Sequence, residues 1–151
     1  MSLNMKIRPF QPSDEAAVVA LWEHCGLVRP WNDPHKDIQR KLAVRPDLFL
    51  VGVLQDEVVA TAMAGYEGHR GWISYLAVSP DHQRSGLGRA IMNEAERLLR
   101  EFGCPKINLQ VRSTNTDVID FYRSLGFLEE DVVNLGKRLE HDGPRPETPP
   151  S

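Results

Sequence analysis

Hydrophobic and polar positions follow two different periods along this chain, and the clearest change of period lies near its middle. Residues 72–78 alternate and are rich in β-branched and aromatic side chains, which predicts a strand ending near Val78. Residues 79–81, Ser-Pro-Asp, break that pattern. Across 87–102 apolar residues recur with helical spacing, so an amphipathic helix is predicted there, ending at Gly103.

The remaining patterns predict a mixed sheet flanked by helices. A hairpin is expected where two apolar runs flank the polar turn at 55–57. The other helices are expected to begin within 12–15, at Asn32 or Asp33, and after 113–115. The predicted strands are 6–10, 49–54, 58–66, 72–78, 106–111 and a final pair within 127–137. The resulting order is β-α-α-β-β-β-α-β-α-β-β, an α/β (α+β) class of fold.

Length and composition favour one globular domain. The 151 residues are 41% hydrophobic and 26% charged, and no apolar run is long enough for a membrane span. The N-terminus lacks the pattern of a signal peptide, so a cytoplasmic protein is expected. We assign the domain to 5–140, treat 1–4 as a candidate leader before Met5, and predict that the Pro-rich tail 141–151 is disordered.

Charge and cysteine usage narrow the range of partners. A formal net charge of -3 argues against bulk nucleic-acid binding, so an anionic ligand would need local positive potential. The two cysteines form no disulfide framework, and the histidines have no ligand-like spacing. We therefore predict no metal site.

A glycine-containing loop joins the central strand to the central helix. Gly86 and Gly88 leave backbone N–H groups bare where the helix begins, and its dipole favours an anion there. Arg84 and Arg89 flank the loop and can add charge-assisted contacts. A dinucleotide fingerprint would need a third glycine where Ile91 stands, and a P-loop would need Lys and then Ser or Thr after the last glycine. Neither motif is present.

The loop instead resembles the Gln/Arg-x-x-Gly-x-Gly/Ala signature of the GNAT superfamily of acetyl-CoA-dependent N-acetyltransferases. The resemblance includes the preceding 76–80, Leu-Ala-Val-Ser-Pro, and resumes at 115–127, where an Asn precedes a helix that carries a Tyr and closes with Gly-Phe. Two signatures in this order are more specific than either alone. The match runs from about Arg8 to Leu139, and the chain resembles the branch that acetylates protein N-termini, such as ribosomal-protein alanine acetyltransferases.

The resemblance implies the acyl-CoA N-acyltransferase fold, whose mixed, mostly antiparallel sheet has splayed central strands. It implies acetyl-CoA as cosubstrate and the Val78 backbone N–H as the donor that polarises the thioester carbonyl. Tyr122 is the expected general acid, since its reference pKa of about 10 keeps it protonated at neutral pH. The cofactor is expected to contact Leu76, Ala77, Val78, Gln83, Arg84, Ser85, Gly86, Leu87, Gly88, Arg89 and Asn115.

The general base and the acceptor pocket are less well defined by the sequence. Many family members carry a glutamate in the central strand, but 72–78 contains no acid, so Glu67 and His69 in the preceding turn are the candidates. Trp31, Asp33 and Tyr75 are candidates for the acceptor pocket.

We expect direct transfer of acetyl to a primary amine, either a protein N-terminus or a small amine, because neither signature contains a cysteine. The alternatives are a non-catalytic acyl-CoA sensor and a mainly structural dimer. A homodimer is also compatible with the enzyme.

Overall fold

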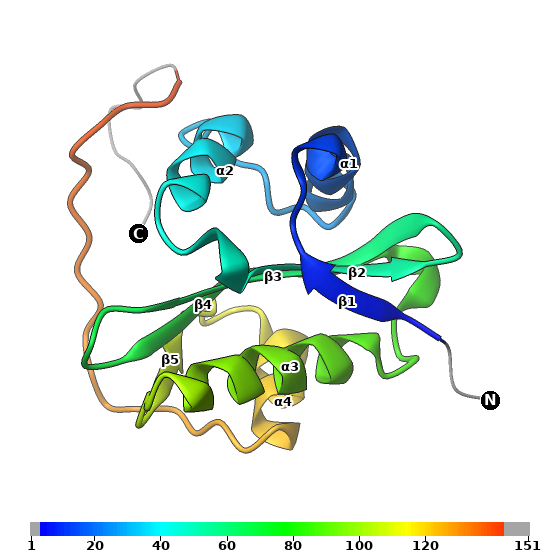
Figure 1. The fold of residues 1–151 in the computed structure, drawn as a ribbon. Coiled ribbons are helices and arrows are strands. Elements are labelled where there is room, and N and C mark those ends of the chain that lie inside the picture. Colours follow the sequence, from blue (N-terminus) through cyan, green and yellow to red (C-terminus); the bar gives the residue numbers. More distant parts are fainter. Residues whose placement is uncertain (1–3, 144–151) are drawn as a thin grey trace.

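A five-stranded sheet with helices on both faces forms the protein (Figure 1). The computed structural model describes residues 4–143. Helices α1 and α2 cover one face of the sheet, and α3 and α4 cover the other. The strands are β1 (Lys6–Pro9), β2 (Phe49–Leu54), β3 (Glu57–Tyr66), β4 (Gly71–Val78) and β5 (Ile107–Leu109); the helices are α1 (Glu15–His24), α2 (Pro34–Leu42), α3 (Leu87–Glu101) and α4 (Thr116–Ser124).

The strands lie in chain order across the sheet. The first four are antiparallel to their neighbours, whereas β4 and β5 run parallel and are joined through α3. Gln55 and Asp56 turn the β2–β3 hairpin, each with positive φ, as two-residue hairpin loops require. The predicted fold class is confirmed by this mixed, mostly antiparallel sheet.

Two apolar cores lie on opposite faces of the sheet because side chains alternate along each strand. On one face, Trp22 of α1 and Ile38 of α2 pack over Phe49 and Val51. On the other, residues of α3 such as Ile91 and Leu99 pack over Leu50 and Ala62. Tyr122 of α4 joins this second core. None of the helices within 4–143 is long and apolar enough to cross a membrane.

The predicted helix boundaries are close to those observed. Asp33 is the N-cap of α2, its carboxylate accepts hydrogen bonds from the amides of His35 and Lys36, and Pro34 is the first helical residue. Before α1, a short 3₁₀ turn spans Pro12–Asp14. Asp14 pairs with Arg8, and this hydrogen bond lowers the pKa of the Asp14 carboxyl.

The strand pair predicted within 127–137 does not form. This segment has no strand in the structure, and it meets β5 through side chains only, with Gln110 bonded to Asn134, and both Lys106 and Asn108 bonded to Glu130. The chain passes β5 once and continues toward α2 instead of turning back (Figure 1). A strand needs a backbone partner, and within 4–143 this segment has none.

The start of the predicted tail also differs from expectation. Asp142 accepts two hydrogen bonds from Arg40 of α2, at 2.6 and 3.0 Å, and one from the amide of Asp33. The interaction with Arg40 holds the pKa of the Asp142 carboxyl well below its usual value. Residues 141–143 are therefore attached to the fold, and the rest of the predicted tail and most of the candidate leader lie outside the described residues.

Candidate active site

Strand β4 loses its neighbour on one side before it ends. Its pairing with β5 covers only Gly71, Trp72 and Ile73, so the edge of β4 that faces β5 is unpaired from Ser74 to Val78. A cavity of about 290 Å³ lies in this gap, lined by 72–75 and by Gln110 just past β5. Backbone groups on such an edge are available to an extended ligand that carries amides.

A bulge redirects β4 at the same place. Between the pairs Thr61–Ala77 and Met63–Ser74, two residues of β4 oppose one of β3, and Tyr75 has φ of +50°. The Thr61 hydroxyl donates to the Tyr75 carbonyl (2.8 Å) and accepts from Trp22 Nε1 (2.9 Å). Thr61 and Trp22 are fully buried, so this network holds a backbone conformation that a tyrosine rarely adopts.

The loop after β4 has the geometry that a phosphate site needs. Gly86 is the N-cap of α3 with φ of +85°, and Arg84 also has positive φ (63°). A Cβ on Gly88 would lie 3.1 Å from Phe121 and 3.5 Å from Val78. The first residues of α3 thus approach β4 and α4 closely, and among residues 4–143 no side chain makes a capping hydrogen bond at its N-terminus. The residues present fit a phosphate-bearing ligand.

The Val78 carbonyl is held by two side chains. Cys25 Sγ donates to it at 3.3 Å and Gln83 Nε2 donates at 3.2 Å. Burial raises the pKa of the Cys25 thiol, so this cysteine is protonated at neutral pH and is a poor nucleophile. These contacts fix the orientation of the last peptide groups of β4.

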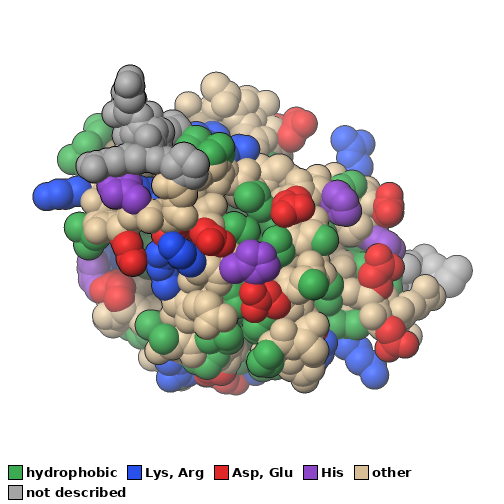
Figure 2. Space-filling view, turned by 90° about the horizontal axis from the view of Figure 1, so that it is seen from above, with side chains coloured by type: hydrophobic (Ala, Val, Ile, Leu, Met, Phe, Trp, Pro, Cys, Tyr) green, Lys and Arg blue, Asp and Glu red, His purple; other side chains and the backbone are tan. Residues whose placement is uncertain are grey.

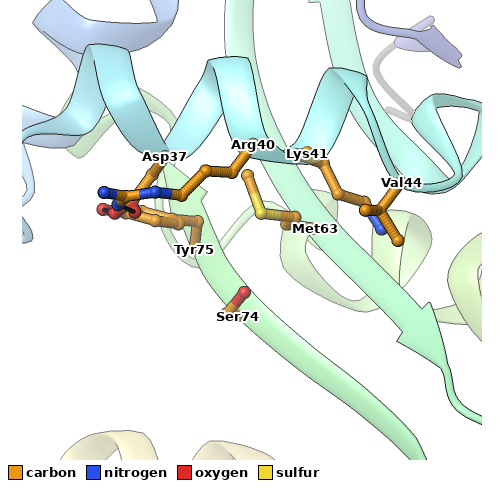
Figure 3. A pocket seen from close by; sticks show the side chains of 7 residues that line it. All are labelled: Asp37, Arg40, Lys41, Val44, Met63, Ser74 and Tyr75. Atoms are coloured by element: carbon orange, nitrogen blue, oxygen red, sulfur yellow. Dashed lines mark hydrogen bonds and ion pairs between the residues drawn. The ribbon is translucent and has the colours of Figure 1, made fainter. Parts of the chain in front are cut away.

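A second cavity, of about 410 Å³, opens between α2 and the bulge of β4 (Figure 3). Its polar end is formed by Asp37, Arg40 and Tyr75, whose side chains converge in Figure 3. Tyr75 Oη donates to Asp37 Oδ2 at 2.5 Å, and Arg40 Nη1 donates to Asp37 Oδ1 at 3.0 Å. Burial and the neighbouring Asp37 raise the pKa of Tyr75, so its phenol keeps its proton. Lys41, Val44, Met63 and Ser74 complete the lining.

The charged groups near this cavity are a few individual side chains and not a patch of one sign. Lys41 Nζ donates to the Ala64 carbonyl, and burial lowers the pKa of Lys41. On the face that carries α1 and α2, acidic and basic side chains are interspersed (Figure 2). Recognition of a charged acceptor therefore depends on groups within the cavity more than on a broad field.

The Tyr122 side chain of α4 is buried. It is 8% exposed, and its ring packs edge-on against Phe121 and Phe127 with centroid distances of 5.2 and 5.6 Å. Burial raises the pKa of Tyr122 to about 12. Asn115 is the N-cap of the same helix, but its side chain makes no capping hydrogen bond.

The predicted base candidates lie at the opposite end of β4 from Val78. The Glu67 carboxylate accepts from the amides of His69 and Arg70, which closes the exposed β3–β4 turn. Val78 lies seven steps along the strand from Gly71, roughly 23 Å. The structure therefore does not bring Glu67 or His69 together with the glycine loop.

The acceptor candidates are only partly brought together. Tyr75 lines both cavities. The Asp33 carboxylate caps α2, and Trp31 in the preceding turn lines neither cavity. Sequence reasoning missed Asp37, which is one helical turn after Asp33 and faces Tyr75. The absence of an acid from β4 was the only sequence signal that a carboxylate had to come from another element.

Comparisons with known proteins agree with this geometry. The model of the acetyltransferase (GNAT) family matches residues 16–127. A protein of Yersinia enterocolitica named as an acetyltransferase is 48% identical over 135 residues, which are 89% of this chain and 96% of that protein. The chain therefore belongs to the GNAT family and is an acetyltransferase, as its two signatures predicted.

Solved structures share the fold. Ard1 of Thermoplasma volcanium superposes with a TM-score of 0.72 at 27% identity, covering 82% of each chain. The ribosomal-protein-S18-alanine N-acetyltransferase of Escherichia coli superposes with a TM-score of 0.70 at 23% identity, covering 83% of this chain and 79% of that one. At that identity the second similarity concerns the fold alone. Acetyl-CoA is the acetyl donor of the GNAT family, which accords with an α3 N-terminus at Gly86 that has no side-chain cap within 4–143.

Proposed function

We propose that the protein transfers acetyl from acetyl-CoA to a primary amine, and that donor and acceptor meet at residues 74–78 of β4. One observation carries this proposal: the same short stretch of β4 borders two sites. Its backbone edge on the side of β5 is unpaired, and its residues also line the 410 Å³ cavity between α2 and the bulge, which Asp37 lines as well. A ligand on each side would therefore approach the bulge at Tyr75. Acetyl-CoA supplies a thioester carbonyl, which an amine attacks.

On the donor side, the protein uses mainly backbone groups. The amides around Gly86 and Gly88 bind the pyrophosphate, and Arg84 and Arg89 add positive charge. The free edge of Leu76, Ala77 and Val78 pairs with the amide-bearing arm of the cofactor, and the Val78 N–H donates to the thioester oxygen. Gln83, Ser85 and Leu87 shape the same loop. The side-chain amide of Asn115, which makes no capping hydrogen bond to α4, is available for a further contact with this arm.

Tyr122 serves as the general acid that protonates the departing thiolate. Because burial raises its pKa to about 12, the phenol carries its proton at any pH at which the enzyme would be assayed. Within the described residues its hydroxyl has no hydrogen-bond partner, so no other group competes with the thiolate for its proton.

On the acceptor side, Asp37 binds the amine. Each of its carboxylate oxygens accepts one hydrogen bond in the structure, from Arg40 or Tyr75, which leaves lone pairs for an ammonium group. The same carboxylate can take the proton that is released on attack. Glu67 and His69, the base candidates from the sequence, lie at the end of β4 that is far from Val78. Attack is direct, since the Cys25 thiol is protonated and bonded to the Val78 carbonyl.

Release of free thiol from acetyl-CoA tests the proposal. Wild type and Tyr122→Phe would be compared across a panel of small amines and N-terminal peptides. Tyr66→Phe is the control, because among residues 4–143 the Tyr66 hydroxyl bonds only to the Gly68 carbonyl. Loss of a general acid is expected to lower kcat by about 100-fold or more, whereas Tyr66→Phe should leave kcat unchanged.

Thiol release that requires an amine and falls in Tyr122→Phe would support the proposal, and the best amine would define the acceptor class. Equal kcat in all three proteins would remove Tyr122 from the chemistry. A non-catalytic sensor would bind acetyl-CoA and release no thiol with any amine; relatives named as acetyltransferases do not favour that alternative.

A further inference from the structure

One basic side chain in the cavity between α2 and the bulge of β4 has no acidic partner. Lys41 of α2 lines this cavity and is half-buried. Its ammonium group donates to the Ala64 carbonyl at 2.5 Å, and among residues 4–143 it forms no ion pair with a carboxylate. Burial lowers the pKa of Lys41, because a charge is costly in a partly dehydrated site. An ammonium group carries three donors, so two remain for an anionic ligand.

The other basic side chains close to this lysine are already paired. Arg40 donates to Asp37 and twice to Asp142, so two carboxylates share one guanidinium and that end of the cavity keeps a negative charge. The acid whose charge favours the ionised lysine is Asp47, but Arg45 donates to both of its oxygens, at 2.6 and 3.1 Å. The lysine is therefore the basic group of the cavity that a ligand can still engage.

The two ends of the cavity carry opposite charge. Asp37 and Lys41 are four residues apart on α2, so they lie on one face of the helix with about 6 Å between their levels. In Figure 3 the Asp37 side chain meets Tyr75 at one end, whereas Lys41 extends toward Val44 at the other. Met63 lies between the two ends. A ligand that spans the cavity thus passes from an anionic group, over an apolar side chain, to a cationic group.

This order of groups defines the chemistry of a matching acceptor. Its amine lies beside Asp37, its middle part is apolar and covers Met63, and its far end accepts hydrogen bonds from Lys41. Because the two charged ends lie at least about 6 Å apart along α2, several bonds must separate the amine from the anion. A cavity of about 410 Å³ is of the size that holds a small molecule.

We propose that the acceptor is a small primary amine with an anionic group, a carboxylate or a phosphate, at the far end of an apolar chain, and that Lys41 binds this anion. The inference rests on the proposed function, because it takes Asp37 as the group that binds the amine. Charge-assisted hydrogen bonds from a lysine to an oxyanion are stronger than neutral ones, so Lys41 determines which amines are preferred.

A length series of acceptors tests this inference. Release of free thiol from acetyl-CoA is measured with ω-amino acids that have one to five methylene groups between amine and carboxylate. Each is compared with the alkylamine of equal length, which has a methyl group in place of the carboxylate. The longer amino acids should exceed their alkylamines in kcat/KM by at least about tenfold, whereas the shortest should show no advantage, because it cannot reach both ends. A matching series of aminoalkyl phosphates tells which anion is preferred.

Lys41→Met removes the positive charge and keeps an unbranched apolar side chain. The ratio of kcat/KM for the best amino acid to kcat/KM for its alkylamine should fall to near one. Both substrates are measured on the same protein, so a loss of stability cancels from this ratio. Lys36→Met is the matched control, because Lys36 is an exposed lysine of the same helix that does not line the cavity. Its ratio should stay at the wild-type value.

The outcomes separate this inference from the proposed function. Equal use of amino acids and alkylamines by wild type, or an unchanged ratio in Lys41→Met, would overturn the inference and leave acetyl transfer in place. So would a peptide N-terminus with a higher kcat/KM than every small amine. No thiol release with any amine would contradict the proposed function itself, and the inference would fall with it.

Discussion

The two sides of β4 are built in different ways. The side that we propose binds the donor, at residues 76–89, is one continuous stretch, and the proposal places its chemistry on backbone amides near Gly86 and near the close approach at Gly88. The acceptor side is assembled from side chains of α2, β3 and β4 that are far apart in sequence, with Asp37 and Tyr75 separated by 38 residues.

Because the two sides of β4 are built differently, substitutions on them should have different consequences. A backbone site tolerates changes of most side chains but depends on the conformation of a few residues. A side-chain site can be altered one residue at a time without disturbing the strand. Variants on the donor side should therefore abolish activity toward every amine, whereas variants on the acceptor side should change which amines are used.

The largest effect is expected for Gly86→Glu. Gly86 has positive φ, and a carboxylate there would stand where we propose that the phosphates bind, so affinity for acetyl-CoA should fall by at least about 100-fold. Isothermal titration with coenzyme A measures the change.

Gly103→Glu is the control that distinguishes loss of the phosphate site from backbone strain at a glycine with positive φ. Gly103 lies just past the other end of α3, has nearly the same φ (81° against 85°), and likewise has open space around it. Its variant should bind coenzyme A as wild type does. Equal losses in both variants would mean that helix stability, and not the phosphate site, had been tested.

A smaller effect is expected for Thr61→Val, which leaves the indole N–H of Trp22 without its buried acceptor and releases the Tyr75 carbonyl. Unfolding free energy should fall by about 1–3 kcal/mol. The bulge that presents Tyr75 should loosen, so KM for the amine should rise more than KM for acetyl-CoA. Thr61→Ser keeps the hydroxyl, so the ratio of KM for the amine to KM for acetyl-CoA should stay at its wild-type value. If Thr61→Val raised only KM for acetyl-CoA, the bulge would belong to the donor side.

The comparison also explains what the sequence could predict. The central strand, the glycine loop and α3 were predicted because their signals are local: alternation, then a Ser-Pro break, two glycines and a helical period. The family was recognised from two such local signatures and is confirmed by relatives. The roles expected for the individual cofactor residues stay predictions.

The acceptor side gave no comparable signal. Asp37 lies on a helix among Lys36, Gln39 and Arg40, a context typical of a solvated face, and only the packing of α2 against the bulge brings it to Tyr75. The strand pair within 127–137 was wrong for a related reason. Its alternation is that of a strand, but pairing depends on a partner, which local sequence does not reveal.

The most direct test is two-substrate kinetics of Asp37→Asn, with acetyl-CoA and a primary amine each varied against the other. The change removes a charge from the acceptor cavity and leaves residues 76–89 untouched. We predict that KM for the amine rises by about tenfold, with KM for acetyl-CoA unchanged. A variant that instead loses affinity for acetyl-CoA, or that handles the amine as wild type does, would contradict the division of β4 into a donor side and an acceptor side.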